Sequence, residues 1–93
     1  MKHYILAKFL SREDAAESLP RICEIFSAAP EIPGVHGVEV YPCCIDRPNR
    51  MDVMIVLDMD KEALPVYDDS AMHRLWKAEF GARLESKSIF DRE

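Results

Sequence analysis

The sequence predicts an α+β fold in which two β-α-β units interlock. Alternating side chains indicate one strand over residues 2–10 and another over residues 51–59. Apolar residues recur at helical spacing in the segment that follows each strand. The resulting order, β-α-β-β-α-β, is that of the ferredoxin-like fold, a four-stranded antiparallel sheet with two helices on one face. We expect a single domain over residues 1–93, because a chain of this length supports one modest core.

The first strand is largely apolar on both faces. One face carries His3, Ile5, Ala7 and Phe9, and the other carries Tyr4, Leu6, Lys8 and Leu10. Ser11 can cap the helix that follows, in which apolar side chains recur up to residue 29. Cys23 has the spacing of a small core residue in that helix. Pro20 predicts a kink or a restart, with Ser18 as a second cap.

The middle of the chain contains a turn signal and two further strands. Pro30 ends the helix, and Ile32-Pro33-Gly34 places proline and glycine at the two central positions of a type II turn. A second strand is expected at about residues 35–43, before the polar loop at 45–50. The run "MDVMIVLDM" then forms the third strand, again apolar on both faces.

The second helical region is predicted to be interrupted. Asp60 can cap its start, and Ser70 can cap a helix that begins at residue 71. Tyr67 and His73 are six residues apart and would point about 120° apart on one unbroken helix. The break at Ser70 therefore decides whether the two rings meet. The second helix carries a predicted core stripe of Met72, Leu75, Trp76 and Phe80, with Gly81 as its stop and a last strand over residues 83–90.

The two-sided strands predict a homodimer. Both helices cover one sheet face, so the other would remain an exposed apolar patch larger than monomers tolerate. A second copy packed through this open sheet face would cover it. In this account Ile5 and Ile55 belong to the surface that pairing shelters.

Composition and charge exclude several classes of partner. The net charge of -5 argues against nucleic-acid and anionic membrane surfaces, which attract clustered Lys and Arg. The first ten residues, "MKHYILAKFL", resemble neither a signal peptide nor a membrane span, so we expect a cytoplasmic protein with reduced thiols.

The three histidines are dispersed, and Cys43 and Cys44 would lie on opposite faces of an extended strand. We expect no metal and no cofactor; an incidental role for these two cysteines is favoured over a redox-sensitive one.

The sequence resembles the stress-responsive dimeric α/β-barrel (Dabb) family, and within it the plant polyketide-cyclase (olivetolic acid cyclase-like) branch. The resemblance is carried by these residues: Lys2-His3, Ile32-Pro33-Gly34-Val35, the strand from Asp52 to Met59, Tyr67 with His73, and Ile89-Phe90-Asp91. It implies a homodimer whose two sheets form one barrel. It also implies that Tyr67 and His73 form a catalytic pair for an aldol condensation in a cavity between sheet and helices. Where that branch has a histidine and a tyrosine in its pocket, this chain has Asp52 and Ile25.

Three functions remain open. The first is a stress-response-type dimer that binds a small apolar or aromatic molecule, with His3, Ile5 and Trp76 as candidate ligand-binding residues. The second is a cofactor-independent cyclase or monooxygenase in which His73 is the general base and Tyr67 stabilises the enolate. The third is a scaffold whose cavity is incidental. If His73 is not a general base, we expect its ring to form a hydrogen bond to nearby backbone. If His3 does not contact a ligand, we expect it to be buried with one backbone partner.

Overall fold

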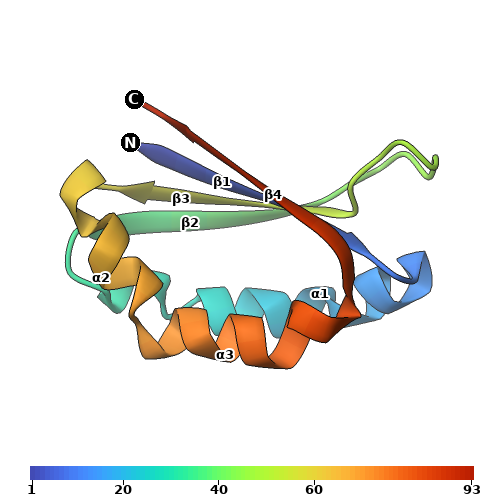
Figure 1. The fold of residues 1–93 in the computed structure, drawn as a ribbon, viewed down its shortest axis with the longest axis horizontal. Helices are drawn as coiled ribbons and strands as arrows, with labels where there is room; N and C mark the ends of the chain where they lie inside the picture. The colour runs from blue at the N-terminus through green and yellow to red at the C-terminus, as the bar shows by residue number, and fades with distance from the viewer.

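The computed structural model describes residues 1–93 and confirms the predicted fold. Its four strands are β1 (Lys2–Phe9), β2 (Val35–Pro42), β3 (Val53–Met59) and β4 (Leu84–Arg92). They form one sheet in the order β2-β3-β1-β4, and each neighbouring pair is antiparallel. The two long helices, α1 (Arg12–Phe26) and α3 (Ala71–Phe80), lie side by side on one face of the sheet (Figure 1).

Helix α1 is capped as predicted but is not interrupted. The Ser11 hydroxyl accepts a hydrogen bond from the Asp14 amide at 3.3 Å, and the helix continues through Pro20. Ser18 is therefore not a cap; its buried hydroxyl donates to an Asp14 carboxylate oxygen at 3.3 Å. The prediction for Cys23 is wrong, because this side chain is exposed. It follows Ile22 by one residue, about 100° around the helix, and so leaves the buried face.

The turn before β2 has the predicted type II geometry. After the short 3-10 helix η1 (Ala29–Glu31), the Val35 amide donates to the Ile32 carbonyl at 3.0 Å. Gly34 has a φ angle of 85°, which side chains other than glycine rarely adopt. The Gly34 carbonyl in turn accepts from the Asp60 amide at 2.8 Å. The turn thus anchors the start of the second helical region.

The second helical region is divided into four pieces before the last strand. These are η2 (Lys61–Ala63), α2 (Leu64–Asp68), α3 and η3 (Gly81–Arg83). The side chain of Asp60 does not cap η2; it contacts His36 Nε2 at 2.9 Å instead. On α3, Met72, Trp76 and Phe80 are buried as predicted, whereas Leu75 is 42% exposed and lies outside the core, contrary to the prediction. Helix α3 ends at Phe80, directly before the predicted stop at Gly81.

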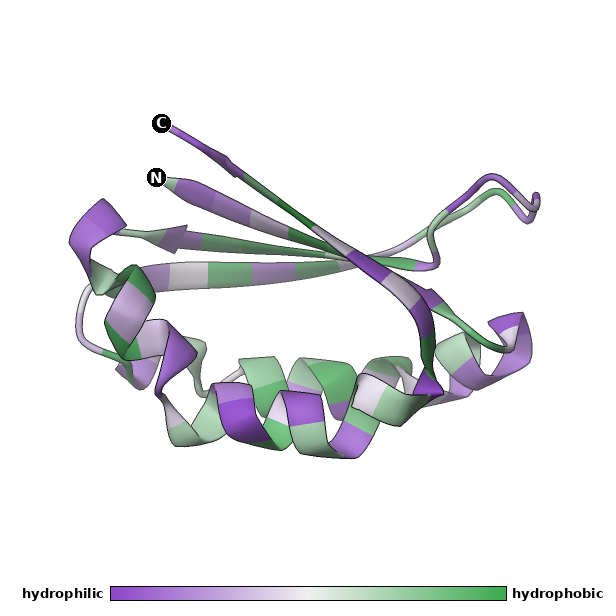
Figure 2. Cartoon of the chain, in the orientation of Figure 1, coloured by the Kyte–Doolittle hydropathy of each residue, from purple (hydrophilic) through white to green (hydrophobic).

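The two faces of the sheet differ in how they are covered. Ile5 and Ile55 are buried beneath the helices of a single chain, at 2% and 0% exposure. The expectation that a second copy shelters these two residues is therefore wrong. The opposite face, here called the open face, carries alternate residues of all four strands. Its apolar members are Tyr4, Leu6, Tyr41, Met54, Val56 and Phe90. Figure 2 shows hydrophobic segments recurring along the strands as well as along the helices.

None of the helices has both the length and the apolar character needed to cross a membrane.

Candidate functional site

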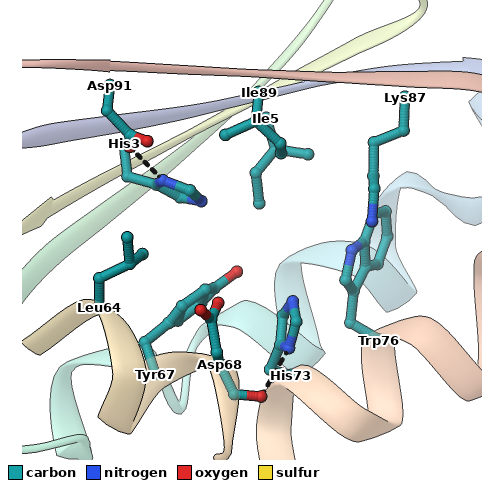
Figure 3. A pocket seen from close by; sticks show the side chains of 10 residues that line it. All are labelled: His3, Ile5, Leu64, Tyr67, Asp68, His73, Trp76, Lys87, Ile89 and Asp91. Carbon is teal, nitrogen blue, oxygen red and sulfur yellow. Dashed lines mark hydrogen bonds and ion pairs between the residues drawn. The ribbon is translucent and has the colours of Figure 1, made fainter.

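A cleft of about 290 Å³ opens between the helices and the β1-β4 side of the sheet. All five candidate site residues contribute to it. Its lining consists of His3, Ile5, Leu64, Tyr67, Asp68, His73, Trp76, Lys87, Ile89 and Asp91. Figure 3 shows the Tyr67 hydroxyl and one ring nitrogen of His73 pointing into this same space, beneath Ile5.

Ser70 builds the junction that brings Tyr67 and His73 together. Its hydroxyl donates to the Tyr67 carbonyl at 2.7 Å and accepts from the His73 amide at 3.1 Å. One side chain therefore closes the end of α2 and caps the start of α3. The rings of Tyr67 and His73 lie with their centroids 4.8 Å apart and their planes tilted by 49°. The predicted break thus places the two rings in contact.

His73 has one ring nitrogen engaged and the other available. Nδ1 lies 3.0 Å from the Asp68 carbonyl oxygen, which can only accept, so this contact places a proton on Nδ1. In the neutral ring the lone pair is then on Nε2. Partial burial lowers the pKa of His73 below its ordinary value of 6.5. The hydrogen bond to the Asp68 carbonyl and the Asp68 charge oppose this shift, and the charges of Lys77 and Lys87 add slightly to it. At neutral pH the ring can therefore accept a proton at Nε2.

Tyr67 carries a buried hydroxyl with no hydrogen-bond partner. The residue is 0% exposed, and its Oη is the one buried side-chain polar atom of the chain left unpaired. Burial raises the pKa of Tyr67 above its ordinary value of 10.0, and the negative charge of Asp68 adds to the shift. The phenol therefore stays protonated and available as a donor. An unpaired buried hydroxyl is costly, because it has lost its water without gaining a protein partner.

His3 lines the cleft from the sheet side, on strand β1. Its Nδ1 pairs with the Asp91 carboxylate of the neighbouring strand β4, across 88 residues of sequence. Its ring also packs edge-on against Tyr67, with centroids 5.5 Å apart. The partner of this buried histidine is thus a carboxylate rather than the backbone. The pair leaves Nε2 as the ring atom of His3 that is free to meet a ligand.

Strand β4 supplies one wall of the cleft that the sequence analysis did not identify. Lys87, Ile89 and Asp91 alternate along it on the helix side, opposite Ala7, Ile5 and His3 of β1. The alternation of β4 could have indicated this wall. Its position beside β1 becomes apparent only once the sheet order is known, since β4 is last in the sequence.

Asp52 and Ile25 lie away from this cleft. The Asp52 carboxylate accepts from the Phe9 amide at 2.8 Å and from Arg12 at 3.2 Å, while Ile25 is a core residue of α1. Arg12 also donates to the Cys43 carbonyl at 2.9 Å. Asp52 therefore joins the end of β1, the start of α1 and the loop between β2 and β3.

Cys43 and Cys44 line a second hollow, of about 320 Å³, together with apolar residues that include Leu6 and Met54 of the open face. No group of three or more His, Cys, Asp or Glu side chains is arranged to hold a metal ion.

Comparison with known proteins identifies the fold. Neither a protein-family model nor a curated protein matches the chain. A dimeric protein of unknown function with a ferredoxin-like fold, from Bacteroides fragilis, matches with a TM-score of 0.81 and 18% identity over 99% of this chain and 93% of that one. A Dabb family protein from Mesorhizobium loti matches with a TM-score of 0.74 and 14% identity, over 99% of this chain and 93% of that one. This chain shares their fold.

A third matching structure is named an antibiotic biosynthesis monooxygenase. Its TM-score is 0.68 at 14% identity, over 100% of this chain and 99% of that one. The Mesorhizobium loti protein confirms the resemblance noted in the sequence at the level of the fold. Function does not follow from these likenesses, because one fold hosts many activities.

Proposed function

We propose that the chain forms a homodimer through the open face and binds a small, largely apolar or aromatic molecule in the cleft. The observation that carries this proposal is the buried, unpartnered hydroxyl of Tyr67. A ligand oxygen that accepts its hydrogen bond would remove the cost of leaving that donor unpaired. The ligand is therefore a molecule with an accepting oxygen, such as a ketone carbonyl, at one end of an apolar body.

The size and lining of the cleft support a ligand of this kind. A volume of about 290 Å³ lies at the lower end of the range for small-molecule sites. The aromatic and aliphatic walls come from Ile5, Leu64, Trp76 and Ile89. The remaining lining residues carry polar or charged groups, so the cleft combines apolar walls with groups that can orient a ligand by hydrogen bonds.

The homodimer is supported by the composition of the open face. Tyr41 is 44% exposed and Phe90 63% exposed, and both lie on this face. Leu6, Met54 and Val56 are only partly covered. The matching Bacteroides fragilis protein is described as dimeric. A second copy is the most economical cover for such a patch.

A titration with 4-acetylbenzamide tests the binding proposal. This neutral probe carries an aryl ring and a ketone oxygen, and Trp76 is both the single tryptophan of the chain and a wall of the cleft. We expect the probe to change the fluorescence of Trp76 and to bind about 3- to 10-fold more weakly to Tyr67→Phe, the effect of one lost hydrogen bond. Tyr41→Phe, on the open face, is the matched control. Equal affinity for Tyr67→Phe, or no binding to the wild type, would contradict the proposal.

An enzymatic role is the second candidate, favoured by the free Nε2 of His73 beside the Tyr67 hydroxyl. In this reaction Nε2 would take a proton from the carbon next to a ligand carbonyl. The C–H electron pair would become a C=C bond, and the carbonyl oxygen would become an enolate oxygen that Tyr67 stabilises by hydrogen bonding. This is the first step of an aldol cyclisation.

Deuterium exchange tests the enzymatic candidate. In heavy water the acetyl methyl protons of 4-acetylbenzamide would exchange faster with the protein than without it, as followed by NMR. His73→Gln would lower the protein-dependent rate by about 10²- to 10⁴-fold, the usual contribution of a positioned base. Oxygen uptake in the same mixture would indicate the monooxygenase alternative, the class named for one matching structure. An exchange rate equal to that of the buffer would contradict this candidate while leaving the binding role in place.

A further inference from the structure

We propose that the ligand of the cleft is an anion, a small aromatic or apolar carboxylic acid that also carries a ketone or hydroxyl oxygen. Its carboxylate would lie against Lys87 and its other oxygen against Tyr67. This inference rests on the proposed function and narrows the class of ligand. It depends on the geometry of one wall of the cleft.

Lys87 is a cation placed at the mouth of the cleft without a partner. It faces the helix side of the sheet, two residues before Ile89, and Figure 3 shows it extending from β4 toward the helices. No carboxylate or other hydrogen-bonding group of the chain pairs with its ammonium group. By contrast, Lys2, Lys8 and Lys61 each form an ion pair. Lys87 is thus the cleft cation with its charge available to a ligand.

The other charged groups of the cleft determine how a bound anion is oriented. Asp91, on the same wall as Lys87, has its carboxylate engaged by His3. Asp68 enters from the end of α2, and its side chain has no cationic partner. A bound carboxylate is therefore attracted toward Lys87 and repelled from Asp68.

The buried donor supplies the second contact. The Tyr67 hydroxyl is fully buried, unpartnered and directed into the same space. A molecule that satisfies both groups needs an anionic end and an accepting oxygen, joined by a body that fits against Trp76 and Ile5. An aromatic keto acid has this arrangement. A neutral ligand would leave Lys87 without a partner.

The test uses two probes that differ only in charge. 4-Acetylbenzoate and 4-acetylbenzamide share the ring and the ketone, and their affinities are compared by calorimetry at low salt. We expect the acid to bind about 3- to 10-fold more tightly, the effect of one partly exposed charge pair, and added salt to reduce this preference. Lys87→Met should remove the preference, and Asp68→Asn should increase it. Both side chains are exposed, so both variants are expected to fold.

Lys77→Met is the matched control. Lys77 lies on α3, is exposed and also influences His73, but it does not line the cleft. This variant should keep most of the preference for the acid. An equal loss in Lys77→Met and Lys87→Met would overturn the inference, because the attraction would then be a property of the overall charge.

The outcomes separate this inference from the proposed function. If both probes bind with equal affinity and Tyr67→Phe weakens both, the ligand site stands and the preference for an anion is wrong. If neither probe binds the wild type, the proposed function fails and this inference fails with it.

Discussion

The rings of Tyr67 and His73 lie with their centroids 4.8 Å apart although the residues belong to different helices. On one continuous helix, a separation of six residues would turn them to different sides. Ser70 makes the contact possible, because its hydroxyl bonds both the Tyr67 carbonyl and the His73 amide. The proposed chemistry of the cleft therefore depends on a helix cap.

Ser70→Ala is predicted to weaken ligand binding as well as stability. Loss of an N-cap hydroxyl costs about 1 kcal/mol of folding stability. Here it also releases the junction that orients the two rings, so affinity for 4-acetylbenzamide should fall by several-fold. Urea unfolding and the Trp76 titration measure the two effects.

Ser11→Ala provides the matched control for Ser70. Ser11 caps α1 by accepting from the Asp14 amide, and it does not line the cleft. Its removal should cost a similar amount of stability and leave probe affinity unchanged. If the two variants lose affinity equally, the role assigned to Ser70 in positioning the rings is incorrect.

His73 is predicted to make the protein less stable below about pH 6.5. Its pKa is lowered in the folded state, so above 6.5 the ring is neutral whether the chain is folded or unfolded. Below 6.5 the unfolded chain binds the proton more readily, and stability falls as the pH drops toward the folded-state pKa. His73→Gln should lack this component while retaining a donor for the Asp68 carbonyl. Urea unfolding of both proteins between pH 5 and 8, at one protein concentration, measures the difference, and a difference independent of pH would refute the assignment.

The order of the elements and the break at Ser70 could be predicted from sequence because both follow from local rules, whereas the contact between Tyr67 and His73 was left open. Strand alternation, the Pro33-Gly34 turn and the Ser70 cap each involve residues close together in the chain. The wrong assignments of Cys23 and Leu75 have a different cause. Both lie one residue away from a buried position, and apolar character alone does not fix where the edge of a buried helix face falls.

The wall of the cleft that β4 supplies could not be predicted because it depends on long-range pairing. The pairing of His3 with Asp91 spans 88 residues, and the placement of Lys87 requires β4 to lie beside β1. Asp52 illustrates the same limit. The family resemblance placed it where that branch has a pocket histidine, whereas the fold uses its carboxylate to hold the Phe9 amide and Arg12.

Gly34→Ala is predicted to destabilise the fold by about 1–3 kcal/mol. The φ angle of 85° is unfavourable for alanine, and an added Cβ would lie 2.6 Å from the Ala63 Cβ. Gly37→Ala is the control, because a Cβ there meets nothing within 4 Å. Comparison of the urea midpoints measures the effect. Similar stabilities for the two variants would show that the turn relaxes without cost.

Val56→Lys is predicted to convert a two-chain assembly into single chains. Val56 lies on β3 in the middle of the open face, beside Tyr4 of β1. A lysine there would lose its water in the proposed interface without a partner, at a cost larger than the apolar contact it replaces. The monomer should still fold, since the core beneath the helices is untouched.

Leu75→Lys is the matched control for that substitution. It makes the same exchange of an apolar residue for lysine, but on the exposed side of α3. In sedimentation velocity, the wild type and Leu75→Lys should move as two-chain particles at micromolar concentration, and Val56→Lys as one chain. Circular dichroism checks that each variant is folded. A wild type that sediments as one chain, or a Val56→Lys variant that remains paired, would exclude the open face as the interface, because a lysine at its centre cannot be accommodated in a dry contact between two sheets.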